Sequence, residues 1–223
     1  ATYKEGRIPV NVDGGLLSIA LDVSCCPHVS YQGMNAVADL RYACKDSLGW
    51  HIQTVDPECH GCSSSSLALD DSGHAHISYF RREFQVRDLK YAFEDAAGWH
   101  LLELYSELTQ FPGFSSLVIA KSGYPRIAFS GIQHLKYAYE DESGWHISFV
   151  YTSSSAGHSV SLALDDFERA HIVQWDYILL RYSYEDESGW HDQTVDTEKF
   201  LGSYPSIALQ TNGFPHISYY DDT

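Results

Sequence analysis

A repeated motif constrains the fold of this chain more than any other feature. An alternating segment of the form Ser-Leu-Ala-Leu, followed by Pro-His-Ile-Ser-Tyr or a close variant, occurs five times. Its copies begin near residues 17, 66, 116, 161 and 206. A second motif, Leu-Lys-Tyr-Ala or a close variant, then an acidic turn and Gly-Trp-His, occurs four times between these copies. Self-similarity at such a period indicates one supersecondary unit per repeat.

The tryptophans of the second motif give the period. Trp50, Trp99, Trp145 and Trp190 are 49, 46 and 45 residues apart. Each repeat holds four short alternating segments, joined by tight turns such as 70–73 and 186–189, which is the pattern of antiparallel hairpins. Four antiparallel strands per repeat, with glycine turns and a periodic aromatic residue, are typical of a propeller blade. No segment keeps a helical period long enough to compete.

We therefore predict an all-β, five-bladed β-propeller with about 45–50 residues per blade, forming one domain over residues 1–223. The last blade, 204–223, contains the first motif without the second. Because 6–13 aligns with 49–56, we expect the N-terminal strand, residues 1–13, to pair with that blade and close the ring. Residues 1–3 are short for the remaining strand, so the closing blade is either thin or completed by another chain.

Composition sets the broad class. The 223 residues, 44% of them hydrophobic, suffice for a sizeable core, and sixteen Tyr, ten Phe and five Trp favour β-structure. The formal charge of −16 argues against nucleic acid and against an anionic membrane as partner. No apolar run approaches the roughly 18 residues of a membrane span, so we expect no membrane insertion. Ala1 fits the first residue of a processed, exported chain, and no signal segment opens the sequence.

These motifs resemble a tandem propeller repeat of exported or surface proteins of prokaryotes, most of them uncharacterised. The resemblance covers essentially the whole chain; it implies the architecture and an extracellular or cell-surface location, and it implies no activity. The turn at 141–145, Asp-Glu-Ser-Gly-Trp, is loosely similar to the Asp-box of sialidase-type propellers. That box reads Ser-x-Asp-x-Gly-x-Thr-Trp, whereas here Trp follows Gly directly. The box is a structural turn, so no catalytic residue carries over.

Eight of the twelve histidines occupy two repeat positions, which argues against a catalytic role because an active site needs one asymmetric constellation. We expect the histidines of the first motif to hydrogen-bond between blades, those of the second to line an outer strand, and the tryptophans to anchor blade cores. The alternative is a set of equivalent ligand pockets between blades. The first-motif histidines are His28, His76, His171 and His216, with Arg126 at the matching position, and the second-motif ones are His51, His100, His146 and His191.

Acidic residues cluster in the turns, all of which strand alternation places on one face. We expect a solvated acidic surface there; Ca²⁺ is the alternative ligand, although no EF-hand spacing occurs. No other cofactor and no metal site are expected. Cys59 and Cys62 have Cys-x-x-Cys spacing without the second pair that a zinc site needs. We expect a local disulfide between them if the protein is exported. Cys25, Cys26 and Cys44 leave at least one free thiol or an intermolecular bridge.

The opposite face carries loops that vary in length and content, and irregular loops on a regular scaffold are where function concentrates. Our candidate ligand-binding residues on it are Arg81, Phe84, Arg87, Trp175 and Tyr177. Three arginines, at 81, 82 and 87, would form a basic spot suited to a carboxylate or sulfate group.

Three functions remain open from the sequence. Our first hypothesis is a non-enzymatic exported binding propeller, lectin-like, that binds a glycan or another polar ligand on the loop-rich face. The second is a hydrolase or lyase acting on polysaccharides, with His134 or His158 and a loop acid. The third is a structural, self-assembling surface protein, a homo-oligomer or polymer in which the incomplete closing blade accepts a strand from a neighbour.

Overall fold

The computed structural model describes residues 17–33, 38–109, 113–131, 134–152, 159–176, 178–197 and 203–220. Within these ranges the chain forms strands and turns without a helix, so the all-β prediction is confirmed and no helix suited to crossing a membrane is present. The strands, in chain order, are β1 (Ser18–Leu21), β2 (Pro27–Gln32), β3 (Leu40–Asp46), β4 (Gly49–Asp56), β5 (Ser63–Leu69), β6 (Ala75–Glu83), β7 (Val86–Asp95), β8 (Gly98–Leu108), β9 (Ser115–Ile119), β10 (Pro125–Gly131), β11 (His134–Asp141), β12 (Gly144–Thr152), β13 (Ser159–Leu164), β14 (Ala170–Trp175), β15 (Leu180–Asp186), β16 (Gly189–Asp196), β17 (Ser203–Leu209) and β18 (Pro215–Tyr220).

Consecutive strands pair antiparallel into five sheets, which we call the first to the fifth in chain order. Strands β1–β4, β5–β8, β9–β12 and β13–β16 form four-stranded sheets, and β17 and β18 form a two-stranded one. Each four-stranded sheet corresponds to one predicted blade, and the fold is propeller-like. The predicted count of five complete blades is not reached within the described residues. The predicted pairing of residues 1–13 with the last blade lies outside them.

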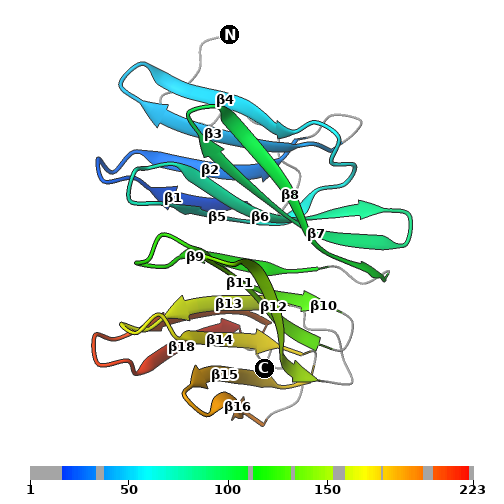
Figure 1. The fold of residues 1–223 in the computed structure, drawn as a ribbon, viewed down its shortest axis with the longest axis vertical. Helices are drawn as coiled ribbons and strands as arrows, with labels where there is room; N and C mark the ends of the chain where they lie inside the picture. The colour runs from blue at the N-terminus through cyan, green and yellow to red at the C-terminus, as the bar shows by residue number, and fades with distance from the viewer. Residues whose placement is uncertain are drawn as a thin grey trace.

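The first strand of each sheet lies beside the first strand of the next, in the order β1, β5, β9, β13 and β17 (Figure 1). One hydrogen bond of the repeat joins each neighbouring pair. Each Ser-Leu-Ala-Leu segment begins with a serine whose hydroxyl oxygen accepts a hydrogen bond from the next sheet. The donor is the backbone N–H of the leucine or isoleucine that follows the equivalent serine in that next sheet. The four bonds are Leu67 N to Ser18 Oγ (3.0 Å), Leu117 N to Ser66 Oγ (3.0 Å), Leu162 N to Ser116 Oγ (3.1 Å) and Ile207 N to Ser161 Oγ (3.2 Å).

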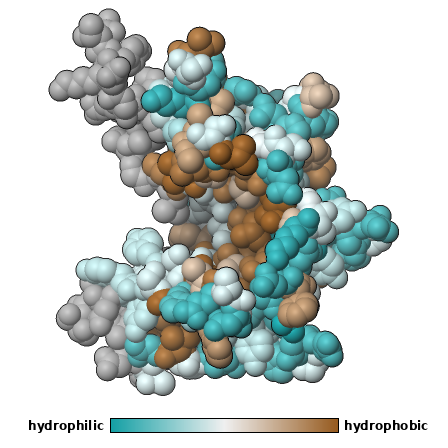
Figure 2. Space-filling model, turned by 90° about the vertical axis from the view of Figure 1, so that its left-hand side faces the viewer, coloured by the Kyte–Doolittle hydropathy of each residue, from teal (hydrophilic) through white to brown (hydrophobic). Residues whose placement is uncertain are grey.

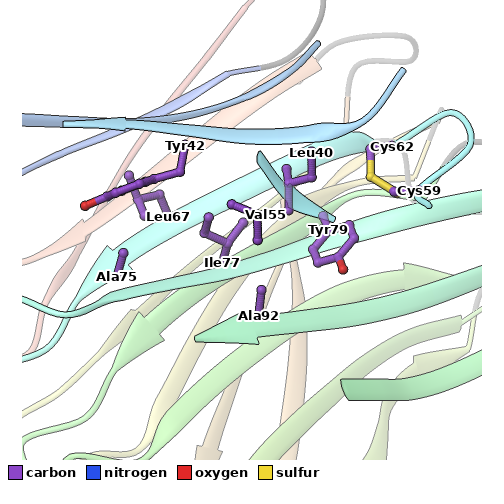
Figure 3. Close-up of a cluster of buried hydrophobic side chains, with 10 residues drawn as sticks. All are labelled: Leu40, Tyr42, Val55, Cys59, Cys62, Leu67, Ala75, Ile77, Tyr79 and Ala92. Atoms are coloured by element: carbon purple, nitrogen blue, oxygen red, sulfur yellow. A yellow bond between two sulfur atoms is a disulfide. The ribbon is translucent and has the colours of Figure 1, made fainter. Parts of the chain in front are cut away.

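The hydrophobic core lies in the seams between sheets rather than within any one sheet. In the seam between the first two sheets, Leu67 and Ile77 of the second sheet pack against Leu40, Tyr42 and Val55 of the first (Figure 3). Period-two alternation turns successive side chains to opposite faces, so each sheet packs against both neighbours.

A disulfide closes the outer end of this first seam. Cys59 and Cys62 are bonded and buried, with a Cα–Cα distance of 5.4 Å, and they belong to the same hydrophobic cluster (Figure 3). Cys25, Cys26 and Cys44 carry free thiols.

Three of the four repeated tryptophans anchor one sheet to the preceding one, whereas the sequence predicted them as anchors of the blade cores. Trp99 meets Tyr42 edge to face with ring centroids 5.3 Å apart. Trp145 meets Tyr91 in the same way at 5.1 Å, and Trp190 meets Tyr137 at 5.4 Å. Such aromatic pairs contribute about 0.5–1.5 kcal/mol beyond the area they bury.

Ion pairs add a second link between sheets that the sequence did not reveal. Lys90 of the second sheet donates to the Asp56 carboxylate at the end of the first sheet (2.5 Å), which also accepts the Tyr79 hydroxyl (2.8 Å). Lys136 of the third sheet is 1% exposed and pairs with Glu107 of the second (3.2 Å). The lysine of Leu-Lys-Tyr-Ala is therefore a structural cation.

The acidic turns cap their own backbone. In the turn between β11 and β12, Asp141 accepts hydrogen bonds from the backbone N–H of Ser143 (2.7 Å), from the Ser143 hydroxyl (2.6 Å) and from His146 (3.1 Å). Gly144 then adopts a φ of +110°, which favours glycine. The same turn recurs in the other complete sheets, so the charge of these residues serves the turn geometry.

The described part of the molecule is an arc whose two ends differ. Figure 2 shows it hollowed on one side, with hydrophobic residues gathered on the upper inner wall. Ile19 of β1 is 61% exposed, whereas its counterparts Leu67, Leu117, Leu162 and Ile207 are 4–8% exposed. Leu21 is also 61% exposed, whereas its counterparts Leu69, Ile119, Leu164 and Leu209 are half-buried. The first sheet therefore presents an uncovered seam face.

Candidate functional site

A cleft of about 670 Å³ lies over one face of the fourth sheet. Strands β14, β15 and β16 form its floor, and Pro215 and Ile217 of β18 form its opposite wall. Its lining residues are Arg169, His171, Tyr182, Tyr184, Glu185, Asp186, Gln193, Thr194, Val195, Pro215 and Ile217. Mixed aromatic and polar linings of this volume are typical of small-ligand sites.

Stacked tyrosine and histidine rings form the floor of the cleft. His171, Tyr184 and His191 are cross-strand partners on β14, β15 and β16. The His171 and Tyr184 rings lie 6.3 Å apart with an interplanar angle of 19°, and the Tyr184 and His191 rings 4.9 Å apart at 20°. Tyr182 stacks on Tyr184 at 5.6 Å. The strand register holds these rings, so the surface is formed before any ligand arrives.

His171 sits between a phenol and a carboxylate. Its Nδ1 atom lies 2.5 Å from the Tyr182 hydroxyl, and its Nε2 atom lies 3.8 Å from Asp165. Burial lowers the pKa of His171, and Asp165 opposes that shift. Burial also raises the pKa of Tyr182 to about 12. Both rings are therefore uncharged near neutral pH, which suits a stacking surface.

The same Asp–His–Tyr arrangement occurs in the first and second sheets. His76 Nδ1 lies 2.5 Å from the Tyr91 hydroxyl, and His28 makes the equivalent short contact with Tyr42. In each case the tyrosine belongs to the same sheet as the histidine. The prediction that these histidines hydrogen-bond between blades is therefore wrong, because the register brings the next strand's tyrosine within reach first.

Among the complete sheets that the structure describes, only the fourth has no tryptophan packed on this face, although Tyr182 is still buried against Ile207 and Ile217. Tyr42, Tyr91 and Tyr137 are each covered by a tryptophan of the following sheet. Tyr182 is the matching residue of the fourth sheet, and the two strands of the fifth sheet bring no tryptophan to it. The cleft thus occupies the place that a Gly-Trp-His strand fills in the other seams.

Polar groups border the aromatic floor. Arg169 is bound to Asp165 at 2.7 Å, and its side chain is 41% exposed. Gln193 and Thr194 add an amide and a hydroxyl, and Thr194 accepts a hydrogen bond from Arg181 at 3.1 Å. Donors and acceptors around a flat ring surface can bind the hydroxyl groups of a ligand whose apolar face stacks on the rings.

The two carboxyl groups of the cleft do not form an acid–base pair of their own. Burial raises the pKa of Glu185, whereas hydrogen bonds from Ser188 and His191 hold the pKa of Asp186 at about 2. The third sheet has the same contrast: burial raises the pKa of Glu140, and the pKa of Asp141 is about 2. The contrast belongs to the repeat, so it gives no argument for catalysis in this cleft.

Three of the residues predicted from the sequence lie together in the β6–β7 hairpin, which projects beyond the other sheets (Figure 1). Phe84 is 90% exposed at its tip. Arg81 donates to the buried Asp88 at 2.6 and 2.8 Å and also contacts Glu83 and Glu103. Arg87 is buried, which lowers its pKa. Arg81 is thus held in place by Asp88 of the same hairpin.

The other predicted residues are placed elsewhere. Trp175 ends β14 of the fourth sheet, opposite Ser159 of β13. Tyr177 and His158 lie outside the described residues. His134 meets the Phe149 ring edge to face at 5.1 Å. The hairpin belongs to the second sheet and Trp175 to the fourth, and a single site formed by the five candidates stays a prediction.

Carboxylate and imidazole groups were also candidates for metal binding. In the part of the chain that the structure describes, no three such groups come close enough together to hold an ion. Ca²⁺ on the acidic turns remains a prediction.

Comparisons with known proteins give the fold alone. No family model matches the chain, and no curated protein matches its sequence. A protein of unknown function from Dyadobacter fermentans is similar in structure, with a TM-score of 0.64 and 10% identity, over 92% of this chain and 74% of that one. A glycosyl hydrolase from Bacteroides ovatus has a TM-score of 0.53 and 11% identity, over 92% and 83%. The intramolecular trans-sialidase from Ruminococcus gnavus has a TM-score of 0.50 and 11% identity, over 87% and 46%.

Sequence reasoning missed the cleft, because the cleft depends on how the two strands of the fifth sheet sit on the fourth sheet, and the repeat pattern does not specify that arrangement.

Proposed function

We propose that this protein is a non-enzymatic binding protein, lectin-like, that recognises a glycan or a similar polar ligand in the cleft of the fourth sheet. The observation that carries the proposal is the ring surface of His171, Tyr182 and Tyr184, which lines a cleft of about 670 Å³ and has no tryptophan of the fifth sheet packed on it. A pyranose has one apolar face and a rim of hydroxyl groups, and this matches a ring surface bordered by Arg169 and Gln193.

Two further observations support the proposal. The similar structures include a glycosyl hydrolase and a trans-sialidase, so proteins named for carbohydrate chemistry share this fold. The Cys59–Cys62 disulfide suits an oxidising compartment such as the cell exterior. Binding is favoured over hydrolysis because the two carboxyl groups of the cleft have equivalents in the third sheet. There Trp190 packs into the seam, so the pair is a feature of the repeat and not of a catalytic site.

The test is a glycan-array screen with and without Ca²⁺, followed by titration of the best glycan by calorimetry. The variant is Tyr184→Ala, which removes the central ring of the cleft. Its matched control is Tyr139→Ala, the same strand position in the third sheet, where Tyr139 stacks on His146 at 4.9 Å in a filled seam. We expect Tyr184→Ala to weaken binding by at least about tenfold and Tyr139→Ala to leave the affinity unchanged.

Other results would redirect the proposal. If glycan binds and both variants keep the native affinity, the cleft is not the site; Phe84→Ala at the projecting hairpin is then the variant to titrate. If no glycan binds under either condition, the lectin-like function is wrong.

A further inference from the structure

We propose that the uncovered face of the first sheet binds the fifth sheet of a second copy of this chain, so that the protein associates head to tail. The inference does not depend on the proposed function, because the faces involved lie outside the cleft of the fourth sheet. It rests on the way in which neighbouring sheets fit together inside one chain.

Every internal seam joins two unlike faces. One sheet contributes an aliphatic face, centred on the first leucine or isoleucine of Ser-Leu-Ala-Leu. The preceding sheet contributes the serine and alanine of its own Ser-Leu-Ala-Leu segment, together with leucine and tyrosine side chains of its third strand, such as Leu40 and Tyr42. In the seam between the first and second sheets, Leu67 packs on the first sheet and its N–H bonds to Ser18. Leu117, Leu162 and Ile207 repeat this relation in the next three seams.

The first sheet presents the aliphatic face, and none of the residues that the structure describes covers it. Ile19 and Leu21 are 61% exposed, and neighbouring Leu17 and Val23 are also exposed. Ile19 stands at the position of Leu67, so its N–H points to where a serine hydroxyl of a preceding sheet would lie. Soluble proteins seldom expose a contiguous apolar face of this kind unless something binds it.

The fifth sheet presents the complementary face. Ser206, Ala208, His216 and Ser218 are exposed there, although their counterparts in the second sheet, Ser66, Ala68, His76 and Ser78, are partly or fully buried in a seam. Ser206 corresponds to Ser161, whose Oγ atom accepts the N–H of Ile207 at 3.2 Å. Seated on a second copy, Ser206 would accept the N–H of Ile19 in the same way.

Both faces are exposed in the described part of one chain, where neither face is buried against the other. A second copy can bury them by repeating the register of the internal seams. The contact joins unlike patches, and heterologous contacts of this kind produce a ring or an open filament. The formal charge of −16 opposes association, so we expect added salt to strengthen it.

Sedimentation velocity over a concentration range from about 1 to about 200 µM tests the proposal. We expect the native chain to show a mass that rises above 25.1 kDa with concentration. Ile19→Lys on one face and Ala208→Arg on the other should each keep the mass at 25.1 kDa. The matched control is Leu48→Lys, an exposed turn residue away from both faces, which should associate like the native chain.

Mixing the two monomeric variants gives the sharpest result. Each retains one intact face, so an equimolar mixture should form a dimer and nothing larger. Three outcomes would overturn the proposal: a native chain that stays at 25.1 kDa at the highest concentration, a mixture that does not dimerise, or an Ile19→Lys chain that associates like the native one. In the first case, a lower melting temperature for Ile19→Lys would show that the chain's own residues cover the face.

Discussion

Buried histidines carry the clearest consequence at the scale of single residues. His76 and His171 each contact a tyrosine hydroxyl at 2.5 Å, and burial holds the pKa of both below the usual 6.5. As the pH falls, the unfolded chain therefore binds protons at these positions at a higher pH than the folded chain does. Their contribution to stability is complete above about pH 6.5 and is lost as the pH falls toward the folded-state pKa.

We predict that the melting temperature decreases between about pH 7.5 and pH 5.5 and that His76→Gln/His171→Gln flattens this dependence. Burial raises the pKa of Asp165, but hydrogen bonds from Arg169 bring that pKa below its ordinary value. Carboxylates of this kind therefore lose their contribution to stability only at lower pH. Circular dichroism melts measure the effect, with exposed His60→Gln as control. An unchanged slope in the double variant would mean that these histidines are not the groups responsible.

At the scale of elements, packing between neighbouring sheets stabilises the fold. Trp145 of the third sheet packs edge to face on Tyr91 of the second, at 5.1 Å. Trp50 occupies the same position in the first sheet, where it packs against residues of its own sheet such as Val29 and Ala43. The two tryptophans are identical in local sequence and differ in what lies across the seam.

We predict that Trp145→Ala destabilises the protein by about 3 kcal/mol, the lower end of the range for removing a core aromatic residue, because Trp145 is half-buried. Trp50→Ala should cost clearly less, because no tyrosine of a preceding sheet lies across from it in the described part of the chain. Urea unfolding of both variants gives the comparison. Equal losses would show that the tryptophans act within their own sheets and not across seams.

The elements also show what the sequence can predict. The 45–49-residue tryptophan period, the glycine turns and the alternation predicted the strands and their order within each sheet. The period also predicted the tryptophans as core anchors. Contacts between repeats, such as Lys90 with Asp56, were not predicted, because they depend on how one sheet sits on the next. The loop arginines were misleading because Arg81 looks free in sequence yet is bound to Asp88, seven residues away.

At the scale of the whole molecule, one seam rule accounts for the core and for both surfaces of interest. Four internal seams bury Leu67, Leu117, Leu162 and Ile207 and bond their N–H groups to serines. The cleft of the fourth sheet is a seam without its tryptophan strand, and the exposed β1 face is a seam without a preceding sheet. The candidate ligand site and the candidate assembly surface are thus both seam surfaces that lack one of the parts found in the internal seams.

Backbone amide hydrogen exchange, resolved residue by residue by NMR in dilute solution, tests this seam rule most directly. The account predicts strong protection of the Leu67, Leu117 and Leu162 amides, which bond to serine oxygens across seams. The Ile19 amide, at the same position in β1, should exchange rapidly when the protein is dilute and become protected as its concentration rises. Protection of Ile19 equal to that of Leu67 at every concentration, or rapid exchange at all four positions, would contradict the account.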